Sequence, residues 1–284
     1  MKPLLTLLLL TTSHFSRAQA ASEIYLFDFD IANLELSHGV NISQHPGYDN
    51  QPLFHPSKPV IYYSSFNEQG RSDIKFYHYL GGTTSNLTST PEREYSPTPT
   101  LDGKYISCII QRDNGAQELG QYPIAGGEVM TLVDDLVVGY HAWVNEKNLL
   151  LFVLGEPSTL RWYDLETKEN EVLQSNVGRS LHRVPGKKSI SFVYKPVGED
   201  WRIMQWDYGT RKISTLIPTL PGREDLCWTP NGEILMSDGE VIYIRNPDSP
   251  ATEWKPLSLN LPLKEISRLA MSPDGKKLAV VAAE

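Results

Sequence analysis

The stretch Met271–Val281, MSPDGKKLAVV, lies three residues before the end of the chain and has the pattern of a tight turn followed by a strand. Pro273 fixes the backbone at the start of the turn, Asp274 can bond its own backbone, and Gly275 accepts a positive φ without steric cost. Leu278–Ala283 then supplies an apolar run long enough for one strand. A lone hairpin is marginally stable in water at best, so this one needs further strands from elsewhere in the chain.

The same pattern recurs at even spacing along the chain. The other copies are PLFHPSKPVIYY, PTPTLDGKYIS, HAWVNEKNLLLFV, LHRVPGKKSISFVY and LCWTPNGEILM, which begin at residues 52, 97, 141, 181 and 226. We call the residue just before each turn the anchor, and the six anchors are Phe54, Pro99, Trp143, Arg183, Trp228 and Met271. Successive anchors are 45, 44, 40, 45 and 43 residues apart, and a period of roughly 40–45 residues is typical of a four-stranded propeller blade.

The two ends of the chain are complementary halves of this repeat. Elsewhere an aromatic-rich strand such as Ile74–Leu80 follows the turn hairpin, and a last strand completes the unit. The final copy has only the first two strands, whereas Glu23–Leu36 and Val40–Ser43 have the pattern of the last two. We therefore predict an all-β fold, a six-bladed β-propeller of four-stranded antiparallel blades that is closed by a split blade made from both termini. The predicted blades cover residues 48–90, 91–134, 135–176, 177–220, 221–262, and 263–284 together with 21–44.

Residues 1–20 have the pattern of a secretory signal peptide. Lys2 is a basic start, Leu4–Leu10 is an apolar run broken only by Thr6, and Ala18–Ala20 is a small-x-small cleavage site. The alternative, a membrane anchor, would need an apolar run long enough to span a bilayer. We expect cleavage after Ala20, no membrane insertion afterwards, and a periplasmic or secreted protein.

The net charge of the chain limits the classes of partner that we expect it to bind. The formal net charge is −8, and removal of residues 1–20, which hold Lys2 and Arg17 but no acid, makes it −10. An acidic protein repels phosphate backbones, so we expect no nucleic-acid partner. The two cysteines, Cys108 and Cys227, lie about three repeats apart, and we predict two buried thiols rather than a disulfide. We expect a monomer.

Two copies of the repeat carry a family likeness. MSPDGKKLAVV and WTPNGEILM resemble the TolB-type propeller repeat, a WD-like family whose signature is an aromatic residue, Ser-Pro-Asp-Gly-Lys and an apolar strand. A fair copy at Thr100–Tyr105 and three weaker ones extend the resemblance over the chain after residue 20. The resemblance implies a six-bladed propeller in an exported protein. TolB itself carries an α/β domain before its propeller, while here the split blade is expected directly after the signal peptide, so TolB's role in an envelope complex is an analogy only.

In a propeller, the loops that lead into the innermost strands surround one mouth of the central channel. Counting back from the anchors, we predict that this mouth is polar and carries both signs of charge. The candidate ligand-binding residues are Asp49, Asn50, Glu94, Tyr95, Tyr140, His141, Arg179, Arg223, Glu224, Asp225 and Arg268. Trp143 and Trp228 are instead predicted to wedge between neighbouring blades.

Two functions are compatible with such a mouth. In the first, the chain is a binding module or scaffold that holds an envelope or extracellular protein, a peptide or a glycan, and it needs no cofactor; tyrosine and arginine are enriched at binding hot spots. In the second, it is a metal-dependent propeller enzyme of lactonase or lyase type. Asp49, Glu94 and Glu224 could then bind Ca²⁺, with His141 as a base or Tyr140 as an acid. We expect the first, because motifs such as His-Glu-x-x-His and Gly-x-Ser-x-Gly are missing from the sequence.

Overall fold

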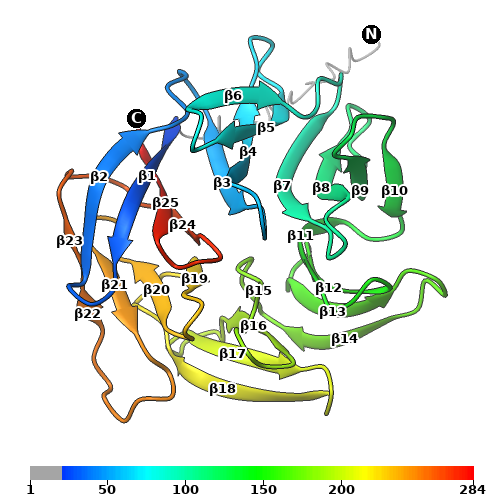
Figure 1. The fold of residues 1–284 in the computed structure, drawn as a ribbon. Helices are drawn as coiled ribbons and strands as arrows, with labels where there is room; N and C mark the ends of the chain where they lie inside the picture. The colour runs from blue at the N-terminus through cyan, green and yellow to red at the C-terminus, as the bar shows by residue number, and fades with distance from the viewer. Residues whose placement is uncertain (1–20) are drawn as a thin grey trace, which may run out of the picture.

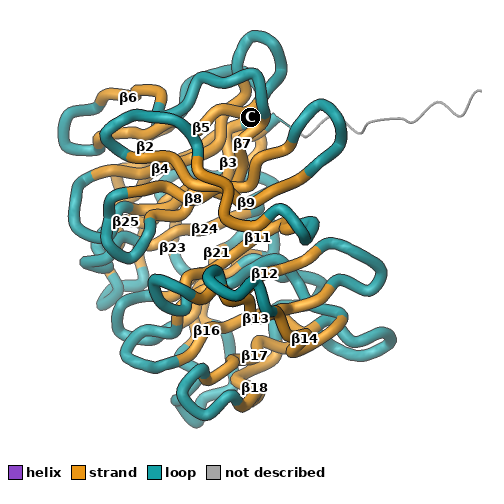
Figure 2. Tube along the Cα trace, turned by 90° about the vertical axis from the view of Figure 1, so that its right-hand side faces the viewer, coloured by secondary structure: helices purple, strands orange, loops and turns teal. Residues whose placement is uncertain are grey.

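The structure, a computed structural model, describes residues 21–284, and the predicted signal peptide lies outside the described residues. Six sheets stand in a ring around a central axis (Figure 1), and the described residues form strands, turns and loops without a helix (Figure 2). The predicted all-β, six-bladed β-propeller is therefore confirmed. Within residues 21–284, no helix is long and apolar enough to cross a membrane.

Five of the blades are four-stranded and antiparallel, and their strands follow one another in the order of the sequence. Blade 1 contains β3 (Asp49–Phe54), β4 (Val60–Phe66), β5 (Ser72–His78) and β6 (Thr83–Asn86), and blade 2 contains β7 (Arg93–Pro99), β8 (Tyr105–Gln111), β9 (Gln117–Pro123) and β10 (Met130–Val133). Blade 3 contains β11 (Val138–Trp143), β12 (Asn148–Val153), β13 (Thr159–Asp164) and β14 (Asn170–Ser175). Blade 4 contains β15 (His182–Arg183), β16 (Ser189–Tyr194), β17 (Arg202–Asp207) and β18 (Lys212–Pro218), and blade 5 contains β19 (Leu226–Trp228), β20 (Ile234–Ser237), β21 (Ile242–Arg245) and β22 (Lys255–Pro256).

Blade 6 is the split blade, and both ends of the described chain contribute to it (Figure 1). Its strands are β1 (Ser22–Asp30), β2 (Glu35–Asn41), β24 (Arg268–Met271) and β25 (Lys277–Ala283). β1 runs antiparallel to β25 over seven consecutive residue pairs, from Ser22 opposite Ala283 to Asp28 opposite Lys277. The hairpin of β24 and β25 therefore takes its third strand, β1, from the other end of the described chain.

Blade 6 differs from the prediction in having a fifth strand. β23 (Ser258–Leu259) lies in the range assigned to blade 5, but it crosses to the outer edge of blade 6 and pairs parallel to β2. The backbone N–H of Ser258 donates to the carbonyl of Leu34 at 2.9 Å, and that of Asn260 donates to the carbonyl of Leu36 at 3.1 Å. This short strand covers part of an edge that would otherwise offer unpaired backbone groups to another chain.

The anchors mark the ends of the innermost strands, β3, β7, β11, β15, β19 and β24, because each of these strands ends at its anchor. Trp143 and Trp228 are buried between blades, as predicted, and each donates its indole N–H to a serine hydroxyl of the preceding blade. The distances are 2.9 Å to Ser107 for Trp143 and 2.9 Å to Ser191 for Trp228. These two tryptophan anchors thus join apolar packing to a specific contact between neighbouring blades. Both cysteines are buried free thiols, as predicted.

Candidate functional site

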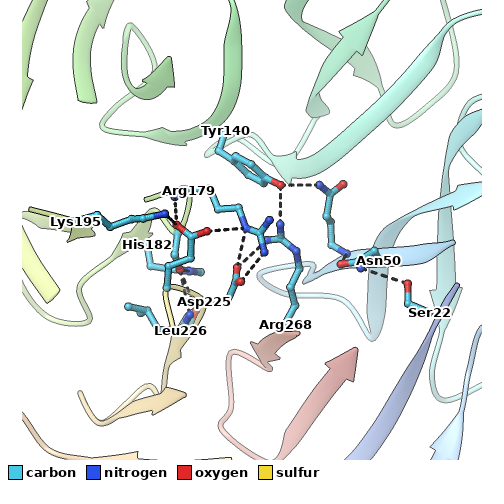
Figure 3. A network of polar contacts seen from close by, with 12 residues as sticks. Ser22, Asn50, Tyr140, Arg179, His182, Lys195, Asp225, Leu226 and Arg268 are labelled. Carbon is cyan, nitrogen blue, oxygen red and sulfur yellow. Dashed lines mark hydrogen bonds and ion pairs between the residues drawn. The ribbon is translucent and has the colours of Figure 1, made fainter. Parts of the chain in front are cut away.

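Six side chains, one from each blade, surround the axis of the central channel. Each lies three residues before an anchor, so the repeat places all six at one level of the channel. We call this set the axial ring, and its members are Gln51, Ser96, Tyr140, Ser180, Asp225 and Arg268. Figure 3 shows Tyr140 and Arg268 meeting near the axis, with Asp225 and the neighbouring Arg179 beside them.

Local breaks in strand pairing turn two of these side chains toward the axis. The register shifts between Asn50 and Leu53 in β3, and between Tyr95 and Thr98 in β7. Gln51 and Ser96 lie in these bulges with φ angles of 58° and 55°. A bulge leaves the inserted residue out of the ladder, and the proline that follows each one, Pro52 or Pro97, has no N–H to leave unpaired.

Asp225 is the centre of the charged part of the site. Arg179 donates to its carboxylate from Nη2 at 2.7 Å and from Nε at 3.4 Å, and Nη1 of Arg268 lies 3.3 Å from Oδ1. Burial alone would raise the pKa of Asp225, but Arg268 and Arg179 outweigh it and hold the pKa below its ordinary value. Asp225 is therefore a carboxylate at neutral pH and bridges blades 4, 5 and 6.

Arg268 also reaches across the channel to blade 3. Its Nη2 donates to the Tyr140 hydroxyl at 2.6 Å, and its guanidinium lies over the Tyr140 ring, 5.1 Å from the centroid. Gln51 of blade 1 donates to the same hydroxyl at 3.2 Å, and its Oε1 accepts the backbone N–H of Ser96 in blade 2 at 2.7 Å. Polar contacts of Asp225, Arg268, Tyr140 and Gln51 thus connect all six blades at one level.

A second acidic residue extends this network outward. Glu224 lies 3.2 Å from Nζ of Lys195 and 3.7 Å from Nε of Arg179. It can approach because residue 178 is glycine: a Cβ there would lie 2.5 Å from the Glu224 Oε2. Arg179 therefore contacts two carboxylates, and its positive charge stabilises them within the site.

His141 lies beside the axial ring and is uncharged. It is 6% exposed, and burial lowers its pKa to about 3. Its Nε2 is 2.6 Å from the Ser107 hydroxyl, the same hydroxyl that accepts the Trp143 indole, while its Nδ1 has no hydrogen-bond partner among the described residues. Burial also lowers the pKa of His182, to about 4, and its Nε2 lies 3.0 Å from the Ser180 hydroxyl.

The axial ring separates cavities that open on opposite faces. We call the face formed by the loops into the innermost strands the loop side, and the face formed by the anchor turns the turn side. The loop side holds one cavity of about 440 Å³ over blades 6, 1, 2 and 3, and another of about 860 Å³ over blades 5 and 6. The turn side holds a cavity of about 270 Å³. Gln51, Tyr140 and Arg268 line both the 270 Å³ and the 440 Å³ cavity.

Most of the predicted mouth residues lie at these cavities. Asn50, Tyr95, Tyr140, Arg179 and Arg268 line the 440 Å³ cavity, and Arg179, Arg223, Glu224, Asp225 and Arg268 line the 860 Å³ cavity. Asn50 donates to the Ser22 hydroxyl at 3.3 Å, and Tyr95 packs edge-on to Tyr48 with ring centroids 6.4 Å apart. Arg223 is exposed and makes no ion pair within residues 21–284. His141 lines the turn-side cavity instead.

Asp49 and Glu94 are placed differently from the other candidates. Both are 0% exposed and lie away from the cavity walls. Glu94 accepts hydrogen bonds from Thr88, Thr90 and Tyr122, and burial raises its pKa. The structure does not bring Asp49, Glu94 and Glu224 together, and no group of three His, Cys, Asp or Glu side chains in residues 21–284 is arranged to hold a metal ion. The calcium site stays a prediction that these positions do not support.

Gln51 follows Asp49 and Asn50 in the stretch predicted to form the mouth, whereas Ser96, at the second bulge, and His182, on the turn side, were not predicted. The Ser-Pro pair at residues 96 and 97 was the available signal for Ser96.

Comparisons with known proteins support the fold. A scan against protein-family models and a search of curated proteins found no match. TolB from Acinetobacter baumannii is similar in structure, with 18% identity and a TM-score of 0.56 over 93% of this chain; the chain spans 64% of that protein. A protein described as TolB from Agrobacterium tumefaciens has 14% identity and a TM-score of 0.71, over 93% of this chain and 99% of that one. An oligogalacturonate lyase in complex with manganese has 11% identity and a TM-score of 0.58, over 87% and 80%. At these identities the likeness shows the fold: this chain is a six-bladed propeller similar to those of TolB structures.

Proposed function

We propose that this protein is an exported binding module that holds a protein, peptide or glycan on the loop side of its channel. The observation that carries the proposal is the axial ring. One residue from every blade takes part in contacts at a single level, so the base of the loop-side cavities is fixed before a partner arrives. A preorganised surface avoids part of the entropy cost of binding.

The rim of the loop side has the chemistry of a recognition surface. Exposed charges of both signs border the 860 Å³ cavity: Arg223, Lys264, Glu240 and Glu265. Tyr48, Tyr95 and Tyr140 border the other cavity. Tyrosine and arginine supply large contact areas together with hydrogen bonds, and mixed charges select a partner by electrostatic complementarity.

The geometry of the enzyme candidates favours binding over catalysis. A general base works best with a pKa near the operating pH, and burial takes the pKa of His141 far below that range. The Tyr140 hydroxyl already accepts hydrogen bonds from Arg268 and Gln51. The alternative, a metal-dependent lyase or lactonase, would also need a ligand set other than Asp49, Glu94 and Glu224.

Arg223 provides the test. Because it is exposed and outside the axial network, Arg223→Glu should leave folding intact and weaken partner capture from an envelope extract, or binding on peptide and glycan arrays, about tenfold or more. Lys212→Glu makes the same charge change on the exposed outer strand β18 of blade 4 and should bind normally. Equal losses in both variants, or no loss in either, would reject the loop side. Arg179 is unsuitable because its reversal would place a third carboxylate beside Asp225 and Glu224.

A further inference from the structure

The turn-side cavity has a wall and a base of different chemistry. The residues two positions before the anchors form an almost entirely apolar band, consisting of Pro52, Pro97, Leu181, Leu226 and Leu269, interrupted only by His141. Beneath the band lies the axial ring, with Gln51, Tyr140, Asp225 and Arg268. A ligand that enters from the turn side therefore meets apolar side chains first and hydrogen-bonding groups at the base.

The charges around this cavity do not balance. Its charged lining residues are three arginines, Arg179, Arg183 and Arg268, and one carboxylate, Asp225; Arg179 also contacts Glu224, which lies outside the cavity. His141 and His182 are neutral near pH 7, so they neither add to the excess nor remove it. The side chain of Arg268 is 16% exposed, and a cation so far from water is stabilised by a nearby anion.

Several groups at the base retain hydrogen-bonding capacity. An arginine has five N–H donors, and contacts of Arg268 within the described chain use only Nη1 and Nη2. The Ser96 hydroxyl, in a residue that is 9% exposed, has no partner among the described residues, and neither does Nδ1 of His141. Both residues line the cavity. Both atoms are themselves buried, so a rotation of the side chain is needed to bring either of them against a ligand in the cavity.

We propose that the turn-side cavity binds a small organic carboxylate, with its carboxylate toward Arg268 and its apolar body against the proline and leucine band. Three features carry this assignment: the excess of arginine over carboxylate in the lining, the donors that Arg268 leaves unused, and the apolar wall above them. The volume of about 270 Å³ is at the low end for ligand pockets, which limits the occupant to a small molecule or to the last residue of a peptide. This site lies across the axial ring from the loop side, so the proposal is independent of the proposed function.

The ligand chemistry is tested by isothermal titration calorimetry on the intact protein with acetate, isovalerate, phenylacetate and phenylacetamide. Affinity should increase from acetate to phenylacetate because more apolar surface is buried, and the amide should bind about tenfold more weakly than the acid, since it lacks the charge. N-acetyl-phenylalanine represents the C-terminal residue of a peptide. If it binds more tightly than the free acids, the occupant of the cavity is a peptide C-terminus, which is recognised by its carboxylate in the same way. Equal binding of acid and amide, or no binding of any acid up to roughly 10 mM, would overturn the proposal.

A matched pair of variants locates the site. Leu53 lines the cavity and is half-buried, so Leu53→Glu and Leu53→Gln make similar steric changes there and differ in charge. Leu53→Glu should reduce carboxylate affinity about tenfold or more relative to Leu53→Gln, because it places a like charge near the ligand. Arg223→Glu, on the loop side, should leave acid binding unchanged. If the two Leu53 variants bind the acids equally, the turn-side cavity is not the site.

Discussion

Asp49 provides the sharpest test of how the blades are packed. It lies at the start of β3, is 0% exposed, and neither carboxylate oxygen has a hydrogen-bond partner of normal geometry in the described chain. Nδ1 of His45 is 3.8 Å away. Burial raises the pKa of Asp49 to about 6, and the neighbouring Ser65 and Lys75 offset only part of this effect.

The direction of the pH dependence follows from this pKa. In the unfolded chain the carboxyl group titrates near its ordinary value of 3.8, whereas burial in the folded protein raises the pKa to about 6. Between these values the folded state holds a proton that the unfolded state has lost, so stability falls as the pH rises from about 4 through about 6. A shift of about two pH units at about 1.4 kcal/mol per unit corresponds to about 3 kcal/mol, fully lost above the folded pKa.

Asp49→Asn removes the charge and should remove this loss. Urea unfolding followed by tryptophan fluorescence should show that the free energy of unfolding of Asp49→Asn, minus that of the wild type, increases by up to about 3 kcal/mol between pH 4 and pH 8. Titrations common to both proteins, including those of His141 and His182, cancel in this difference. Glu253→Gln is the matched control at an exposed carboxylate and should show no such increase. A constant difference for Asp49→Asn across the pH range would refute the reasoning.

Other contacts give further predictions. Trp228→Phe removes the 2.9 Å hydrogen bond to Ser191 and should lower the free energy of unfolding by about 1–2 kcal/mol in urea titrations; an unchanged midpoint would contradict a role for that bond between blades. Deletion of residues 277–284 removes β25, which leaves β1 and β24 without their shared neighbour, and thermal unfolding by circular dichroism should lose its cooperative transition. A cooperative transition that survives would show that the split blade is dispensable. Burial raises the thiol pKa of Cys108 and Cys227, so both should resist a thiol reagent until denaturant is added, and rapid labelling of the native protein would count against their placement.

The turn chemistry made the blade architecture predictable from the sequence. The Pro-Asp-Gly of Pro273–Gly275 and the Pro-Asn-Gly of Pro230–Gly232 require particular backbone angles, and they follow the ends of the innermost strands β24 and β19. The split blade was predictable because the last copy of the repeat has only the first two strands of the unit, and the segment after residue 20 has only the last two. β23 was not predictable, because two residues that pair parallel to a neighbouring blade leave no periodic pattern in the sequence.

The direction of individual side chains was harder to predict. Strand residues alternate between faces, but the bulges in β3 and β7 interrupt the alternation between Asp49 and Phe54, and between Glu94 and Pro99. A count from the anchor therefore gives the correct level along the channel but not the face of the strand. This explains why Tyr140, Arg179, Asp225 and Arg268 line cavities while Asp49 and Glu94 do not.

The pairing of β1 with β25 has a consequence for synthesis on the ribosome. Ile24 and Phe27 are fully buried in the folded protein, but β25, which lies beside their strand, begins 247 residues after β1 ends. At roughly 5–20 residues per second, the first strand waits on the order of ten seconds to a minute for its neighbour. Throughout that interval the nascent chain exposes an apolar strand with an unpaired edge, the kind of segment that molecular chaperones bind.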